Sequence, residues 1–167
     1  MADRFWVGGT ASWDATAGTK WATTSGGAGG ASVPTSADDV YFDANSGTVT
    51  VTMSVSTGNC KNLNFTGFTG TINGSSNIVC VGSLTLSSSM TWALSTTLFM
   101  RAPASAGTQT ITSNGKSITA IVEIGSASIQ PTIELADAFV STNLLNIVGG
   151  TFNTNNYNVT ASSLLGK

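Results

Sequence analysis

Short apolar runs that alternate with polar residues extend over most of the chain. In residues 48–55 (TVTVTMSV), Val49, Val51, Met53 and Val55 fall on one face of an extended strand, and threonine and serine fall on the other. Because successive side chains of a strand point to opposite faces, this alternation predicts a half-buried β-strand. Further short apolar runs occur at residues 63–65, 78–81, 84–86, 98–100, 121–124, 139–140 and 144–148.

Clusters of glycine, serine and asparagine separate these runs, as expected of tight turns. No segment has a sustained helical period, and residues 134–140 are long enough only for a brief helical turn. The chain is therefore predicted to be all-β. The turn clusters lie at residues 58–59, 73–76, 87–89, 114–115, 149–150 and 153–156.

Two distant segments, residues 70–84 (GTINGSSNIVCVGSL) and 150–164 (GTFNTNNYNVTASSL), match without a gap, so their numbering differs by the same amount throughout (150 − 70 = 80). A constant offset is typical of repeating structural units, and four coils of about 20 residues account for it. We therefore predict a β-solenoid, with a β-sandwich or jelly roll as the alternative. Coils of this length place one inward residue per coil in a column: Cys60, Cys80, Met100, Ala120 and Val140.

The chain divides into two regions that differ in composition. Residues 1–47 hold Trp6, Trp13 and Trp21 and a dense glycine cluster, and are predicted to form an N-terminal cap or docking segment. Residues 48–167 are predicted to form the solenoid body as one structural unit. A solenoid end exposes apolar core and unpaired backbone, so it needs a cover. The last residues show none, so we expect that end to be covered by another subunit or by further chain.

Composition excludes several classes of function. Only 8% of the 167 residues are charged and the net charge is −2, without the basic stripe that nucleic-acid binding requires. No stretch reaches the roughly 18 apolar residues of a membrane span. A neutral surface rich in hydroxyl and amide groups is instead typical of extracellular and virion β-proteins. The start (MADRFW) lacks the pattern of a secretory leader, which favours a virion protein released at lysis over an exported one.

The motif in residues 5–42 reads FWVGGTASWDATAGTKWATTSGGAGGASVPTSADDVYF. With its spaced tryptophans and the VPTSADDVYF segment before a Val/Thr strand, it resembles the opening of autotransporter-associated β-strand repeats and of β-helical modules in tailed-phage virion proteins. The resemblance covers residues 1–55, and the remainder of the chain only in general style. It implies a β-helical scaffold displayed on a surface, without intrinsic catalysis.

Candidate chemistry is sparse. Without any histidine, the chain holds neither a Ser-His-Asp nor a Cys-His arrangement. The carboxylates Glu123, Glu134 and Asp137 are not spaced to share one face, and Glu123 is expected on the outer face of its strand as a solvated charge. We therefore predict no catalytic residues and no cofactor.

Three further sets of residues admit two interpretations each. Asp43 and Asn45 have the spacing of a calcium loop but lack its later glutamate, so ordinary turn chemistry competes with a metal site. The three N-terminal tryptophans suit either docking and glycan stacking or a core or cap position. Cys60 and Cys80 form at most one disulfide, with two stacked buried thiols as the simpler interpretation.

These observations predict a non-enzymatic structural protein of a phage virion: a capsid decoration protein, head fibre or tail-fibre module at the virion surface. Its expected partners are other virion proteins and further copies of itself. The alternative is a carbohydrate-binding or adhesive domain on a bacterial cell surface, with host surface glycan as its partner. Neither nucleic acid nor a membrane is an expected partner.

Overall fold

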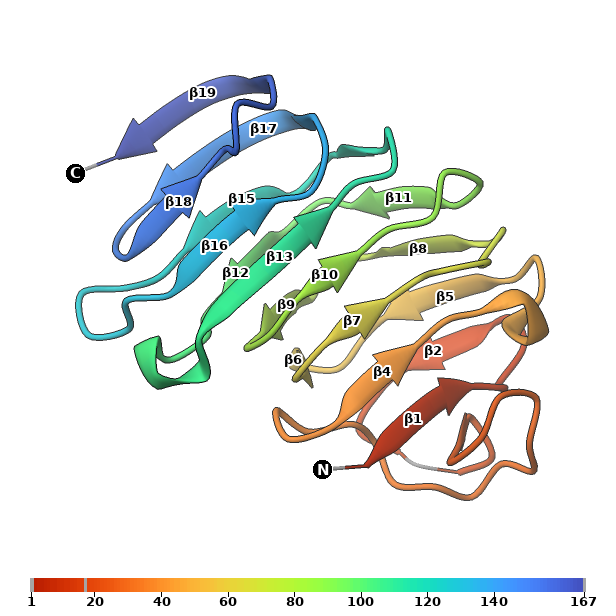
Figure 1. Ribbon diagram of the computed structural model, residues 1–167. Coiled ribbons are helices and arrows are strands. Elements are labelled where there is room, and N and C mark those ends of the chain that lie inside the picture. The colour runs from red at the N-terminus through yellow and green to blue at the C-terminus, as the bar shows by residue number, and fades with distance from the viewer. Residues whose placement is uncertain (1, 17, 167) are drawn as a thin grey trace.

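The computed structural model, which describes residues 2–16 and 18–166, is a β-solenoid of about six turns with coils of roughly 21 residues. Figure 1 shows the strands stacked coil on coil from the N-terminal to the C-terminal end. This architecture confirms the predicted all-β solenoid over the alternative of a β-sandwich. Apart from two short 3-10 helices, η1 (Ala44–Ser46) and η2 (Ala104–Ala106), the regular structure of the described residues consists of strands.

Three sheets, here called A, B and C, run along the solenoid, and almost all of their strand pairs are parallel. Sheet A has the order β18 (Thr151–Asn153), β16 (Thr132–Leu135), β13 (Thr108–Thr112), β10 (Leu84–Thr85), β7 (Leu63–Asn64), β4 (Asp39–Tyr41), β1 (Asp3–Trp6) and β3 (Trp21–Ala22). Sheet B has the order β11 (Thr91–Leu94), β8 (Thr71–Gly74), β5 (Thr50–Met53) and β2 (Ala11–Trp13). Sheet C has the order β14 (Ser117–Ile118), β17 (Phe139–Ile147), β15 (Ile121–Ile124), β12 (Thr97–Met100), β9 (Asn77–Cys80) and β6 (Thr57–Cys60), and β19 (Val159–Gly166) pairs with β17.

Alternation of apolar and polar residues builds one continuous core between the sheets. In β5 the side chains of Val51 and Met53 are buried, whereas Thr50 and Thr52 are only half-buried. Val51 is in register with Ile72, and Ile72 with Trp92, so apolar side chains stack along the axis as an inward column. Parallel stacking thus converts a simple strand pattern into a filled interior.

The predicted inward column is correct for its first three members. Cys60 pairs with Cys80 and Cys80 with Met100, so these two coils have the same length, as expected. Beyond Met100 the prediction is wrong, because Met100 pairs with Ile124. The loop of residues 101–107, which contains η2, lengthens this coil. Ala120 is buried but lies outside β15, and the half-buried Val140 pairs with Ser117.

The repeated segments are not structurally equivalent, although they led to the correct fold. Thr71 lies in β8 of sheet B, whereas its sequence counterpart Thr151 lies in β18 of sheet A. The offset between the two segments therefore does not correspond to a whole number of coils. What the two segments share is a glycine followed by the threonine that begins a strand.

The N-terminal region contributes both the first coil and its cover. β1, β2 and β4 are stacked in the same sheets as the later coils. β3 pairs antiparallel with β1 and lies at the end of sheet A, where Trp6 is opposite Trp21. In residues 2–16 and 18–47 the strands are thus continuous with the sheets of the solenoid.

Candidate functional site

The N-terminal end of the core is filled by aromatic side chains. Trp6, Trp13 and Trp21 are all fully buried. Trp21 packs edge-on against Trp6 and Trp13, with ring centroids 5.1 and 5.0 Å apart, and Phe42 lies within 6.0 Å of all three rings. The interpretation of these tryptophans as docking or glycan-stacking residues is therefore corrected: their rings present no face to solvent, and they occupy the core position that was the alternative.

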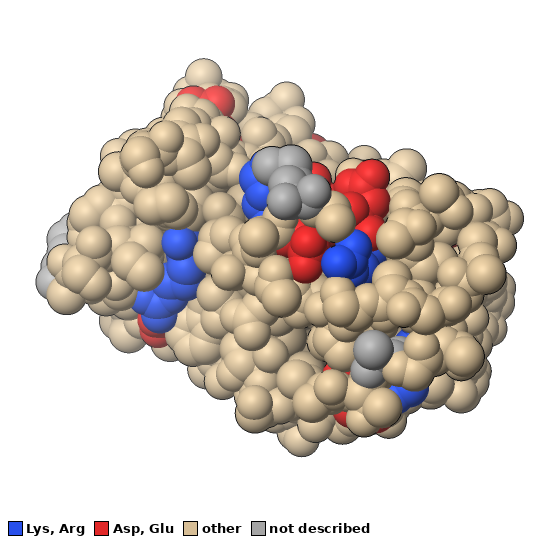
Figure 2. Space-filling model, turned by 90° about the horizontal axis from the view of Figure 1, so that it is seen from below, with Lys and Arg blue, Asp and Glu red and all other residues tan. Residues whose placement is uncertain are grey.

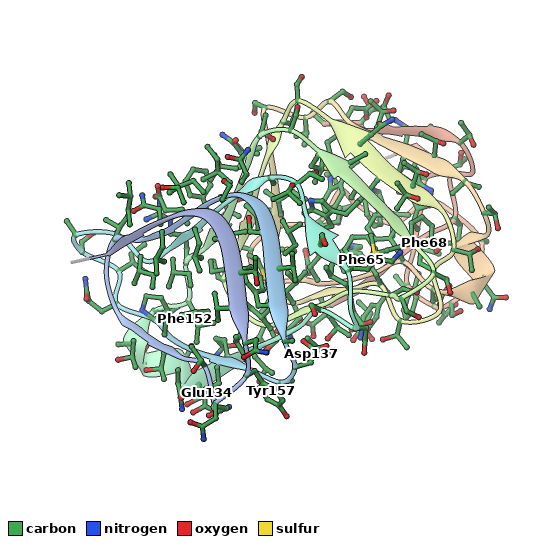
Figure 3. All side chains as sticks on the ribbon, turned by 90° about the horizontal axis from the view of Figure 1, so that it is seen from above. Phe65, Phe68, Glu134, Asp137, Phe152 and Tyr157 are labelled. Atoms are coloured by element: carbon green, nitrogen blue, oxygen red, sulfur yellow. The ribbon has the colours of Figure 1, made fainter. Side chains whose placement is uncertain are left out.

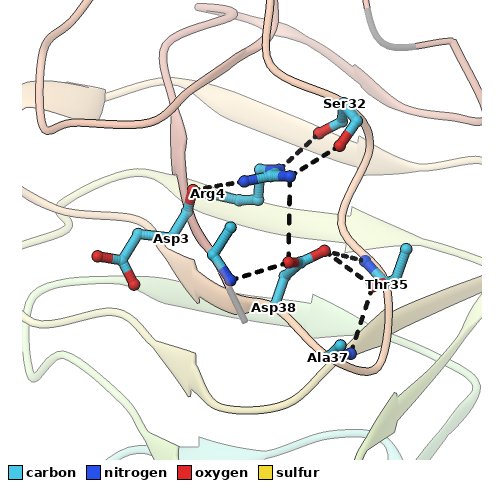
Figure 4. A network of polar contacts seen from close by, with 7 residues as sticks. Asp3, Arg4, Ser32, Thr35, Ala37 and Asp38 are labelled. Carbon is cyan, nitrogen blue, oxygen red and sulfur yellow. Dashed lines mark hydrogen bonds and ion pairs between the residues drawn. The ribbon is translucent and has the colours of Figure 1, made fainter.

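A polar network ties the loop before β4 across this end (Figure 4). Arg4 occupies an inward register position beside the buried Val40, yet its guanidinium reaches the loop. It donates hydrogen bonds to the backbone oxygen and Oγ of Ser32, at 3.0 and 2.8 Å, and lies 4.0 Å from a carboxylate oxygen of Asp38. The other oxygen of Asp38 accepts bonds from the backbone N–H and hydroxyl of Thr35. Asp38 therefore accepts a backbone N–H group at the turn before β4.

We expect Asp38 to make the free energy of unfolding depend on pH in the acidic range. Burial by itself raises the pKa of its carboxyl group, but the hydrogen bonds from Thr35 and the charge of Arg4 outweigh this effect and hold the pKa below its ordinary value of 3.8. A carboxyl group with a lowered folded-state pKa stabilises the fold above its unfolded pKa, and this contribution is lost as the pH falls through the folded pKa. Urea unfolding at about pH 7 and about pH 3 measures the loss. Asp38→Asn should be less stable than wild type at neutral pH and lose less stability in acid; equal losses in both proteins would contradict this assignment.

The Asp43 and Asn45 segment is a helix cap. Asp43 Oδ1 accepts the backbone N–H groups of Asn45 and Ser46 at 2.9 and 3.1 Å, and the Ser46 hydroxyl accepts the backbone N–H of Asp43. The side-chain amide of Asn45 donates to Ser25. This is a capping box around η1, so the turn interpretation explains the residues fully. Among the described residues, no group of three or more His, Cys, Asp or Glu side chains is placed to hold a metal ion.

The three carboxylates considered for catalysis lie at separate places and have structural partners. Glu123 is on the outer face of β15 in sheet C, where it pairs with Arg101 and accepts a bond from Asn146 at 3.2 Å. Glu134 is in β16 of sheet A and accepts a bond from Asn153. Asp137 accepts the backbone N–H groups of residues 113 and 114, which fixes a turn. The expectations that Glu123 and Glu134 lie on different faces, and that Glu123 points outward, are confirmed. The expectation of a solvated charge at Glu123 is wrong, because Arg101 and Asn146 hold its carboxylate.

Cys60 and Cys80 are fully buried free thiols stacked on neighbouring strands of sheet C. The Cys80 thiol donates to the backbone oxygen of Lys61 at 3.2 Å. A hydrogen bond with Cys80, together with burial, raises the pKa of Cys60 well above its ordinary value, which favours the protonated, unreactive thiol at that position. The simpler interpretation of the two cysteines, stacked buried thiols in the core, is confirmed.

The surface of the solenoid is mostly uncharged. Figure 2 shows the charged side chains gathered in a few mixed clusters, with broad neutral areas between them. Large apolar side chains are strongly exposed only near the C-terminal end of the described residues, at Tyr157, Leu164 and Leu165. Of the features that bear on function, the exposed end was anticipated from the sequence. The Arg4 network was missed, because nothing in the local pattern around Arg4 connects it with residues about 30 positions later.

No known protein family, curated protein or solved structure matches this chain. Within residues 2–16 and 18–166, no helix is long and apolar enough to cross a membrane. The described part of the chain also forms no pocket. The site with the most distinctive chemistry is therefore the pair of solenoid ends: one filled with aromatic rings and tied by Arg4 and Asp38, the other with apolar side chains exposed.

Proposed function

We propose that this protein is a non-enzymatic structural module of a tailed-phage virion, serving as a capsid decoration protein, head fibre or tail-fibre component. The observation that carries the proposal is the unbroken stacking of coils, in which Cys60, Cys80, Met100, Ile124 and Ile147 succeed one another in register. A solenoid held by hydrogen bonds from coil to coil is a stiff scaffold. Such a scaffold suits assembly on a particle surface, with other virion proteins or further copies as partners.

Surface chemistry supports the same role. Outward positions of sheets A and B are largely threonine and asparagine, such as Thr50, Thr71 and Thr91 in one column of sheet B. Their hydroxyl and amide groups keep the surface hydrated without charge, which is compatible with a protein exposed to varied external conditions. The N-terminal motif that resembles phage and autotransporter modules supplies the rings that fill the first coil, so its residues serve the scaffold directly.

Purified particles of the phage that encodes the protein provide the test. Quantitative mass spectrometry should find it in the particles, at a copy number close to that of the major capsid protein for a decoration protein and far lower for a fibre. Its absence from washed particles would overturn the proposal. Binding of host surface polysaccharide, measured by calorimetry because the N-terminal indole rings are buried, would instead favour the adhesive bacterial surface domain.

A further inference from the structure

The coil formed by β17, β18 and β19 leaves inward-facing apolar side chains uncovered. Leu164 is in register with the fully buried Leu145, yet 62% of its surface is exposed. Phe152 likewise continues the column of the fully buried Ile133 but is only half-buried. Figure 3 looks onto this end and shows Phe152 beside the outermost strands. Within the described residues, β19 pairs with β17 along one edge only, so its other edge has free N–H and C=O groups.

The opposite end of the solenoid offers no matching edge in sheet A. There β3 lies antiparallel on β1, and the loop tied by Arg4 and Asp38 crosses the core. In sheet A a second copy therefore has no free parallel edge at its N-terminal end on which β18 could continue the stack. A head-to-tail contact thus cannot extend sheets A and C together, whereas a contact between two C-terminal ends can.

The inward-facing residues of β19 are arranged symmetrically on either side of an irregular point in the strand. Register with β17 makes Val159, Ala161 and Leu164 inward, because they pair with Phe139, Ser141 and Leu145, which are buried. The register shifts between Ser141 and Leu144, where Ser162 of β19 alone lies opposite two residues of β17; we call this irregular point, at Ser162 and Ser163, the corner. A two-fold axis through this corner places Ala161 opposite Leu164 of the second copy, inward against inward. A shift of one residue would set apolar side chains against outward positions, so the corner specifies one register.

The strand of this coil that lies in sheet A, β18, is compatible with the same two-fold axis. β18 (Thr151–Asn153) lies on the side of the coil away from the corner, and its middle residue is Phe152. An axis through the corner and through Phe152 pairs β18 with β18 of the second copy as well, with the two Phe152 rings meeting at the centre. One rotation thus extends both edges and closes the core.

Charge does not oppose this contact. Neither β18 (TFN) nor β19 (VTASSLLG) contains an ionisable side chain. Like charges facing one another across an antiparallel pair are destabilising, and here there are none in the two strands that would meet.

We infer that the partner of this end is a second copy of the chain, joined through antiparallel β19–β19 and β18–β18 pairing about a two-fold axis. This inference rests on the proposed assembly role, for which it names the partner and the surface.

Sedimentation equilibrium of the purified chain tests the inference. We expect a mass of twice the 16.9 kDa chain. Leu164→Glu, which puts a charge into the closed core, should return the mass to that of one chain. The matched control is Leu165→Glu, at the neighbouring exposed but outward position, which should remain a dimer. A monomeric wild type, or a dimer that Leu164→Glu does not affect, would overturn the inference.

A covalent test reports the register itself. Antiparallel partners have Cα atoms about 4.5–5.5 Å apart, within the range that a disulfide bridges. Ala161→Cys combined with Leu164→Cys should therefore give a disulfide-linked dimer under mild oxidation with oxidised glutathione, and either substitution alone should not. Absence of the linked dimer in the double variant contradicts the register. The phage particle experiment is independent of both tests. If the protein is found in particles but is a monomer, only this inference is overturned. If it is a dimer but is absent from particles, only the proposed function is overturned.

Discussion

Replacing Phe42 with alanine should lower the free energy of unfolding by about 3–5 kcal/mol, the usual cost of removing a large buried aromatic side chain. Phe42 is fully buried and contacts five rings, those of Trp6, Trp13, Trp21, Phe65 and Phe68. It stacks on Phe65 with a centroid distance of 4.9 Å, so it joins the first coil to the second. Because a domain of this size is stable by only about 5–15 kcal/mol, the loss would consume a large part of the total.

Urea unfolding followed by tryptophan fluorescence measures this effect, because three indole rings surround the mutated position. Phe99→Ala is the matched control: Phe99 lies on the outer face of β12, where its ring stands 4.7 Å from the Arg101 guanidinium carbon. Its removal should cost about 1 kcal/mol or less. Similar midpoints for the two variants would show that the aromatic cluster does not hold the first coil in place.

The sequence predicted an aromatic N-terminal end but not the burial of its rings. Trp6, Trp13 and Trp21 stand near one another in the chain, and their spacing alone allows either an exposed platform or a core. Burial depends on Phe42, which comes from later in the chain, packs against all three rings and itself stacks on Phe65 of the next coil. Contacts of this kind across coils depend on register and are not visible in a local pattern.

Strand alternation predicted the solenoid, whereas coil length could be predicted only for part of it. Equal spacing from Cys60 to Cys80 and Met100 reflects two coils without insertions. After Met100, loop residues 101–107 displace every later position. Solenoid turns accept insertions on the surface with little cost, so the number of residues per coil varies while the strands stay stacked. A constant period therefore fails at the first long loop.

The two repeated segments form the same kind of turn into a strand, at two places in the chain. In both, glycine precedes a threonine whose backbone N–H donates at 2.8 Å to a carbonyl oxygen of the previous coil: Thr71 to Val49 and Thr151 to Pro131. A methyl group on Gly70 or Gly150 would lie 2.2 Å from that same oxygen. The similarity thus arises from a shared backbone requirement, the close approach of one coil to the next, which explains why the two copies enter different sheets.

Gly70→Ala should therefore destabilise the protein by about 3–5 kcal/mol, since the added methyl group displaces Val49 and breaks the hydrogen bond that its carbonyl oxygen accepts from Thr71. It would also lie 2.5 Å from the ring of Phe68, a member of the aromatic core. Gly115→Ala is the control, because Gly115 has a φ of +74° but nothing within 4 Å of the added carbon, so only the backbone cost of about 1–2 kcal/mol applies. Urea midpoints of the two variants separate these causes: if Gly70→Ala were no less stable than Gly115→Ala, close approach of the coils would not be the reason that both segments begin with glycine and threonine.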